Sequence, residues 1–160
     1  MFSKIDVKNK EHMKKIGLIT LAILIFFTGL GYLLLNSSQM QEYNIYLEIR
    51  NQDIEILNSN YNEWNDNLTL ALDDNQINQD EFDDLLDIGL KYELKSSEAV
   101  SNSSKFKNFI ENNDILLKMS GIDTSGNRET ILNDIMTFER NNGNIKYILG
   151  KLNSMREQAA

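Results

Sequence analysis

The chain has 160 residues, a formal net charge of −8 at pH 7, no cysteine, no proline and one histidine. These counts exclude disulfide scaffolds, cysteine-ligated zinc sites and thiol catalysis, and the lone His12 gives no basis for a histidine metal site or a catalytic triad. The acidic balance also argues against a nucleic-acid-binding protein, which usually presents a basic surface.

The first element in chain order is an uncharged stretch of 20 residues from Ile16 to Leu35, of which 15 are apolar. As a helix it would be roughly 30 Å long, which is the thickness of the hydrocarbon core of a bilayer. Residues 1–15 carry a net charge of +3 and residues 36–160 a net charge of −11. Because lysine-rich flanks stay in the cytoplasm, we predict a basic cytoplasmic tail (1–15), a lipid-contacting transmembrane anchor (16–35) and an extracytoplasmic domain (36–160).

Two alternatives assume that the N-terminal segment is removed. A secretory signal usually has a shorter apolar region of about 7–15 residues and a small-residue cleavage site, and Asn36 fits such a site poorly. The run Lys14-Lys15-Ile16-Gly17-Leu18-Ile19-Thr20-Leu21 resembles the leader of type IV prepilins. That resemblance implies cleavage after Gly17 and a pilin-like subunit, although the family's glutamate five residues later is replaced here by Ala22.

Residues 40–72 have the strongest helical periodicity in the outer part. Apolar residues recur at alternating steps of four and three, which is typical of a heptad seam that packs on a partner helix. Arg50 is the one charged residue in this series, and Ala71 ends it. The predicted packing and interaction seam consists of Tyr43, Leu47, Ile54, Leu57, Tyr61, Trp64 and Leu68.

A polar turn follows, and Asn78 with Glu81 has the spacing of a helix capping box. We therefore predict a second helix over 79–95 that forms a hairpin with the first. The serine- and asparagine-rich residues 96–104 are predicted to be a loop, followed by a third helix over 105–119 and a second loop over 120–127.

The last predicted helix covers residues 128–157 and has a second heptad seam. Asn142 falls within this seam, and the run 141–144 contains three asparagines and Gly143, so we expect a kink or a short break there. The chain is thus predicted to be all-α, with an outer bundle of about four helices made of a long hairpin and two further helices. The second seam consists of Ile131, Ile135, Phe138, Ile145, Leu149 and Leu152.

Candidate sites are few. The acidic run after residue 72 resembles the second half of an EF-hand loop, but Leu70, Leu72 and Asn75 stand where that loop needs two oxygen ligands and a glycine. We therefore interpret it as a capped helix start with a solvated acidic face, and predict no metal ligand, cofactor site or catalytic residue. The aromatic residues Trp64 and Tyr92 are assigned to packing rather than to a ligand pocket.

These features predict a non-enzymatic, single-pass protein of the cytoplasmic membrane. Its coiled-coil-like outer domain would bind a protein partner or a second copy, as a subunit of an envelope or surface assembly, and would not bind nucleic acid. The alternative is a sensing module, because a membrane helix followed by about four outer helices resembles in topology the input domain of bacterial chemoreceptors. Such a module would have to signal through a partner subunit.

Overall fold

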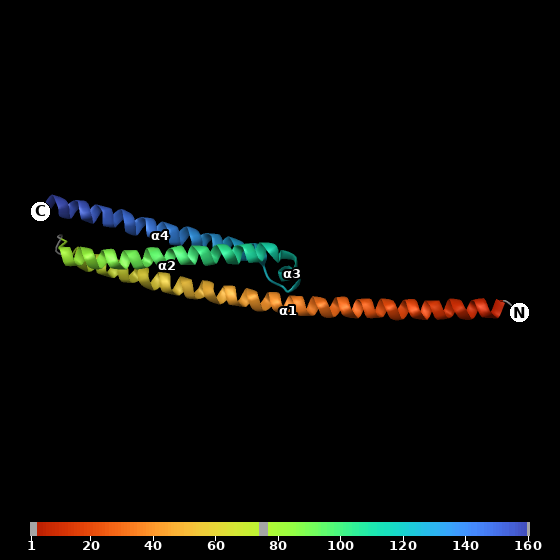
Figure 1. Ribbon diagram of the computed structural model, residues 1–160. Helices are drawn as coiled ribbons and strands as arrows, with labels where there is room; N and C mark the ends of the chain where they lie inside the picture. The colour runs from red at the N-terminus through yellow and green to blue at the C-terminus, as the bar shows by residue number, and fades with distance from the viewer. Residues whose placement is uncertain (1–2, 74–76, 160) are drawn as a thin grey trace. The chain divides into compact units, whose positions relative to one another are not determined.

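The computed structural model describes residues 3–73 and 77–159, and the side chains of residues 17–73 and 77–157. All regular elements in those ranges are helices: α1 (Ser3–Ala71), α2 (Gln79–Asn112), α3 (Asp114–Met119) and α4 (Thr124–Ala159) (Figure 1). The all-α prediction is therefore confirmed for the described residues. The chain divides into two units, residues 1–41 and 42–160, and α1 contributes to both.

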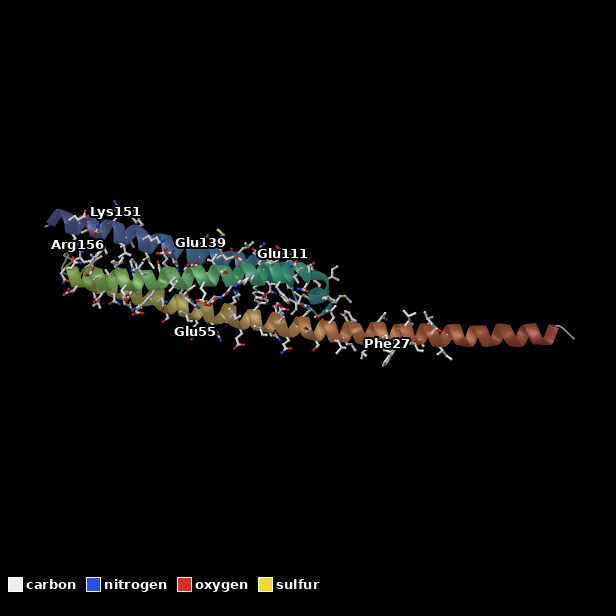
Figure 2. The ribbon with its side chains drawn as sticks, in the orientation of Figure 1. Phe27, Glu55, Glu111, Glu139, Lys151 and Arg156 are labelled. Carbon is white, nitrogen blue, oxygen red and sulfur yellow. The ribbon has the colours of Figure 1, made fainter. Side chains whose placement is uncertain are left out.

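The first unit contains the N-terminal part of α1, which exposes its apolar side chains. Every leucine, isoleucine and phenylalanine from Leu18 to Leu35 is exposed, including Phe27 (Figure 2). The Thr28 hydroxyl donates a hydrogen bond to the Leu24 carbonyl at 2.8 Å, so this polar side chain is satisfied by the helix itself. The stretch lies in a helix that is long and apolar enough to cross a membrane.

The second unit is a bundle of three long helices, formed by the C-terminal part of α1, by α2 and by α4. Tyr43 bonds to Asn127 and Arg50 to Asp134, both 84 residues further along the chain. This constant offset means that α1 and α4 run parallel. α2 runs in the opposite direction to both (Figure 1).

Apolar side chains from all three long helices form one core. α2 contributes its own heptad series, in which buried residues alternate at steps of three and four from Phe82 to Ile110. Three amphipathic helices of this kind can bury their apolar faces only against one another. The main core cluster consists of Leu57, Trp64, Ala71, Phe82, Leu85, Ile88, Tyr92, Ala99, Phe138, Ile145 and Leu152.

The predicted loop over residues 96–104 is wrong, because α2 passes through it without interruption. Ser96, Ala99 and Ser103 continue the heptad series of α2 and are almost fully buried. Their small side chains occupy core positions next to α1 and α4, so packing stabilises a helix in a segment of modest intrinsic propensity. The predicted third helix over 105–119 is also corrected: its first part belongs to α2, and only the six-residue α3 is separate.

α3 ends in a turn that requires glycine. The N–H of Gly121 donates to the Lys118 carbonyl and the N–H of Ile122 to the Leu117 carbonyl, both at 3.0 Å. This is the Schellman arrangement, in which the first residue beyond the helix adopts a left-handed conformation. Gly121 does so with φ of +84°, and the predicted loop after residue 119 is therefore confirmed but shorter, because α4 begins at Thr124.

The short break that was one expectation for residues 141–144 is absent, since α4 is helical throughout. Phe138 and Ile145 are buried on either side of this run, and Asn142 between them is half-buried. Gly143 lies on the exposed face, where a helical glycine costs about 1 kcal/mol relative to alanine. The packing of the flanking core residues outweighs that cost.

The turn between α1 and α2 ends in the predicted capping box. The Glu81 backbone N–H donates to Asn78 Oδ1 at 3.0 Å, and the Asn78 backbone N–H donates to Glu81 Oε2 at 2.9 Å. Two of the four unpaired N–H groups at the start of a helix are satisfied in this way. The start of the second helix at Gln79 is therefore confirmed.

Candidate functional site

Both predicted seams lie inside the bundle of the second unit. Their partners are the other helices of the same chain, so these residues are not a free interaction surface. Leu47, Ile54, Tyr61, Leu68, Ile135 and Leu149 are half-buried. The seam residues that are fully buried are Tyr43, Leu57, Trp64, Ile131, Phe138, Ile145 and Leu152.

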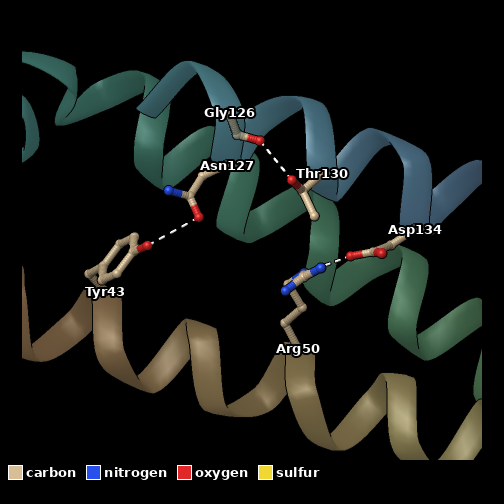
Figure 3. Close-up of polar contacts among 6 residues, drawn as sticks. All are labelled: Tyr43, Arg50, Gly126, Asn127, Thr130 and Asp134. Carbon is tan, nitrogen blue, oxygen red and sulfur yellow. Dashed lines mark hydrogen bonds and ion pairs between the residues drawn. The ribbon is translucent and has the colours of Figure 1, made fainter. Parts of the chain in front are cut away.

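Polar side chains connect α1 to α4 beside the apolar core. The Tyr43 hydroxyl bonds to Asn127 Oδ1 at 3.2 Å, and Arg50 Nε donates to Asp134 Oδ2 at 2.6 Å (Figure 3). Burial raises the pKa of the Tyr43 phenol above its ordinary value. Arg50, the charged exception in the first seam, thus has a partner, and its pairing ties the register of α1 to that of α4.

A second polar group joins α1 to α2. Asp53 is almost fully buried and accepts from Lys95 Nζ at 2.8 Å and from Asn102 Nδ2 at 3.0 Å. The hydrogen bond that Lys95 donates to Asp53 raises the pKa of the Lys95 ammonium, more than partial burial lowers it. A buried carboxylate needs such partners because it has lost its water. This cluster therefore has a structural role.

The aromatic residues that could have formed a ligand pocket pack in the core. Trp64 and Tyr92 have no exposed surface, and the ring centroids of Tyr61 and Tyr92 are 5.8 Å apart. Gly89 of α2 lies next to Trp64 and α4: a Cβ at this position would lie 3.8 Å from Trp64 Nε1 and 2.9 Å from Leu149 Cδ1. The absence of a side chain at Gly89 thus allows α4 and the tryptophan to approach α2.

The acidic cluster at the start of α2 is solvated. Asp80, Asp83, Asp84 and Asp87 are exposed, and Asp87 forms an exposed ion pair with Lys91 at 2.6 Å. In the part of the chain that the structure describes, no three acidic or histidine side chains come together in a way that could hold a metal ion. Asp74 and Asn75, which belong to the EF-hand-like run, lie outside the described residues.

The outer face shared by α2 and α4 carries the features that packing does not explain. Lys146 Nζ of α4 bonds to Glu93 Oε1 of α2 at 2.6 Å, which brings the two helices together here. Three large side chains close to this pair in the sequence are exposed, Leu90 and Leu94 near Glu93 and Tyr147 next to Lys146, and two glycines flank Tyr147 along α4. We call this set the α2–α4 face; it consists of Leu90, Leu94, Gly143, Tyr147 and Gly150.

The glycines of the α2–α4 face differ from Gly89. A Cβ added at Gly143 or Gly150 would meet nothing within 4 Å, so the bundle does not require glycine at either position. Each lowers helix stability by about 1 kcal/mol relative to alanine. Sequence reasoning missed this face because it followed buried seams. The available signal was the spacing of Gly143, Tyr147 and Gly150 by four and three residues along one helix face.

Open hollows are also present on the bundle surface. One, of about 530 Å³, is lined by Asn113, Ile115 and other residues at the junction of α2 and α3, and another, of about 110 Å³, lies near the α1–α2 turn.

Comparison with protein-family models, curated proteins and solved structures finds no match to this chain. The functional argument therefore rests on the residues and contacts described above.

Proposed function

We propose that this chain is a membrane-anchored, non-enzymatic interaction protein of the cytoplasmic membrane. Residues 16–35 span the bilayer, residues 1–15 remain in the cytoplasm, and the helical domain in residues 36–160 lies outside. There it presents the α2–α4 face to a protein partner or a second copy, as a subunit of an envelope or surface assembly.

Charge and exposure support the anchoring part of the proposal. The apolar side chains from Leu18 to Leu35 are exposed, which is unfavourable in water and favourable in lipid. The net charge is +3 before this segment and −11 after it. An excess of lysine on one side is the main determinant of membrane orientation.

The interaction part is carried by the two exposed glycines of the α2–α4 face. Glycine in a helix lets another backbone approach closely, and no described atom lies within 4 Å of the place that a Cβ would take at Gly143 or Gly150. Tyr147 between them is 67% exposed, and tyrosine is enriched in protein interfaces. Leu90 and Leu94 of α2 add apolar area, so we propose that a helix of the partner packs across α4 at the glycines.

Site-specific photocrosslinking in membranes tests this contact. Tyr147 is replaced by benzoylphenylalanine, which keeps an aromatic ring at that position, and Glu55 on the outside of α1 is the control (Figure 2). We expect a discrete crosslinked product from position 147 and little from position 55. A product of twice the chain mass identifies a second copy, and any other mass identifies a different partner protein by mass spectrometry.

The glycines are then replaced in the protein that carries benzoylphenylalanine at position 147. Gly143→Leu and Gly150→Leu place a bulky side chain on the contact, and we expect at least a tenfold loss of product. Asn133→Leu, at an exposed position nearer the N-terminus of α4, is the matched control and leaves the product unchanged. If all three variants crosslink like the parent, or position 147 behaves like position 55, the proposed contact is wrong.

A sensing role is the second candidate, and one observation favours it. Two buried polar atoms, Trp64 Nε1 and Asn142 Oδ1, have no hydrogen-bond partner among the described residues. A small polar ligand that entered the bundle could bond to them. A screen of small polar ligands by the emission of Trp64, the single tryptophan, tests this role, and an unchanged spectrum throughout counts against it.

A further inference from the structure

α3 closes one end of the bundle in the second unit. This is the end at which α1 enters the unit after residue 41 and α4 begins. The Thr124 hydroxyl, which is fully buried, donates to Asp114 Oδ1 at 2.5 Å and so joins the first residues of α3 and α4. Leu117 on the inner side of α3 is also fully buried. α3 is therefore firmly attached to the bundle.

The outer side of α3 carries two large apolar side chains beside the exposed Lys118. Ile115 and Met119 are four residues apart, so they lie on one face of this short helix. Their side chains are 74% and 64% exposed, although the opposite face already buries Leu117 in the core. No described residue of the second unit covers them, and two large apolar side chains on a six-residue helix indicate an external contact.

The length of the connecting chain limits what that contact can be. The apolar stretch ends at Leu35 and the second unit begins at Glu42, which leaves only residues 36–41 between them. The seven Cα–Cα steps from Leu35 to Glu42 span at most about 25 Å when the chain is fully extended, and about 10 Å when it is helical. If Leu35 marks the edge of the hydrocarbon core, the α3 end of the bundle is held next to the lipid headgroups.

Three carboxylates on and beside α3 already accept hydrogen bonds from groups of the same chain. Asp114 Oδ2 accepts from Lys118 Nζ at 2.8 Å, and Glu111 accepts from Lys107 Nζ at 2.9 Å. Asp123 Oδ1 accepts from the Gly126 backbone N–H at 3.0 Å. These pairings lower the cost of bringing carboxylates toward an interface, and the tether makes the encounter intramolecular, so weak apolar contacts are sufficient.

We infer that α3 is a membrane-contact element, whose Ile115 and Met119 side chains insert into the interfacial region of the phospholipid bilayer that holds the anchor. This inference rests on the proposed membrane anchoring of residues 16–35. It goes beyond that anchoring because it assigns a second lipid contact that fixes one end of the bundle at the membrane. The α2–α4 face is a different surface and stays available to a protein partner.

The absence of cysteine allows a direct test with single-cysteine labels in the full chain. Ile115→Cys and Met119→Cys are labelled with an environment-sensitive fluorophore. Leu70→Cys, at a position 73% exposed in α1 near the α1–α2 turn, is the matched control for Ile115. Phe27→Cys reports on the anchor itself. The labelled proteins are placed in phosphatidylcholine vesicles with and without a lipid that carries a spin label close to its headgroup.

We expect the spin-labelled lipid to quench the labels at positions 115 and 119 at least twofold more than the label at position 70. This quenching persists when the amount of protein per vesicle is lowered, because the contact is with lipid. If position 27 is quenched while positions 115 and 119 behave like position 70, the α3 contact is wrong and the anchor stands. If position 27 is not quenched either, the anchoring proposal is wrong and the α3 contact falls with it. A third result would also overturn the lipid contact. The labels at positions 115 and 119 would escape quenching but show the emission of a buried site, and that emission would be lost when the protein is diluted. Another protein molecule, and not lipid, would then cover them.

Discussion

Because Gly89 has no side chain, α1 and α4 can pack closely against α2 at this position. A Cβ there would lie 3.0 Å from Ile145 Cγ2 and closer still to Leu149, whereas Gly143 and Gly150 on the opposite side of α4 have open space. The same residue type therefore has two roles in one bundle: close internal packing in α2 and, as we propose, close approach by a partner on α4.

We predict that Gly89→Leu lowers the free energy of unfolding by about 1–3 kcal/mol, because the added side chain overpacks the core. Gly150→Leu should not lower it, because leucine is the better helix former and the position is open. Denaturant titration of the detergent-solubilised full chain, followed by Trp64 fluorescence, measures both. Equal stability of Gly89→Leu and the parent would contradict the packing role of Gly89.

The pair of Asp53 and Lys95 should make the free energy of unfolding depend on pH in the alkaline range. Because its hydrogen bond raises the pKa of Lys95 in the folded state, the stabilisation by this pair is fully present below the ordinary lysine pKa of about 10.4. It is lost as the pH rises through the raised pKa. Lys95→Met leaves the buried carboxylate with Asn102 alone, and we expect a loss of about 1–3 kcal/mol at pH 7.

The difference between Lys95→Met and the parent should be constant from pH 6 to pH 9 and shrink above pH 10. Denaturant titrations at each pH give this difference directly. Lys91→Met is the control, because its ion pair with Asp87 is also on α2 but is exposed. Exposed pairs contribute little, so this variant should have the parent's stability, and a loss as large as that of Lys95→Met would refute the argument from burial.

At the scale of elements, small residues explain where sequence reasoning succeeded and failed. The seams of α1 and α4 were recognisable because large apolar residues mark most of their positions. In the middle of α2 the same heptad positions hold Ser96, Ala99 and Ser103, which read locally as a polar loop. They are helical because α1 and α4 pack on both sides of them, and that information is not contained in the segment itself.

Ser101→Pro tests the continuity of α2 at an exposed position. A proline inside a helix removes a backbone hydrogen bond and clashes with the preceding turn, at a cost of about 3 kcal/mol or more. We therefore expect a large loss of stability, measured by denaturant titration or by the loss of helical circular dichroism on heating. Ser101→Ala should be neutral or slightly stabilising, and a fully stable proline variant would restore the loop interpretation.

For the whole molecule, the main question is whether the apolar segment stays in the mature protein. The proposed anchor requires the intact chain of 18.5 kDa in the membrane fraction, resistant to extraction by high salt and released by detergent. We expect mass spectrometry of the purified membrane protein to give this mass. A mass that lacks residues 1–17 would support the pilin-like alternative, and one that lacks the whole apolar stretch would support a secretory signal.

The sequence alone determined the helical class, the apolar segment, the two large-residue seams and the capping box at Asn78. Each of these depends on local spacing or on the chemistry of neighbouring residues, which a single chain displays directly. The tertiary structure decided that the seams face one another, that α2 and α4 continue through their polar stretches, and that Ile115, Met119 and Tyr147 remain exposed. Those outcomes depend on contacts between segments far apart in the chain, because the burial of one helix face is set by the helices packed against it.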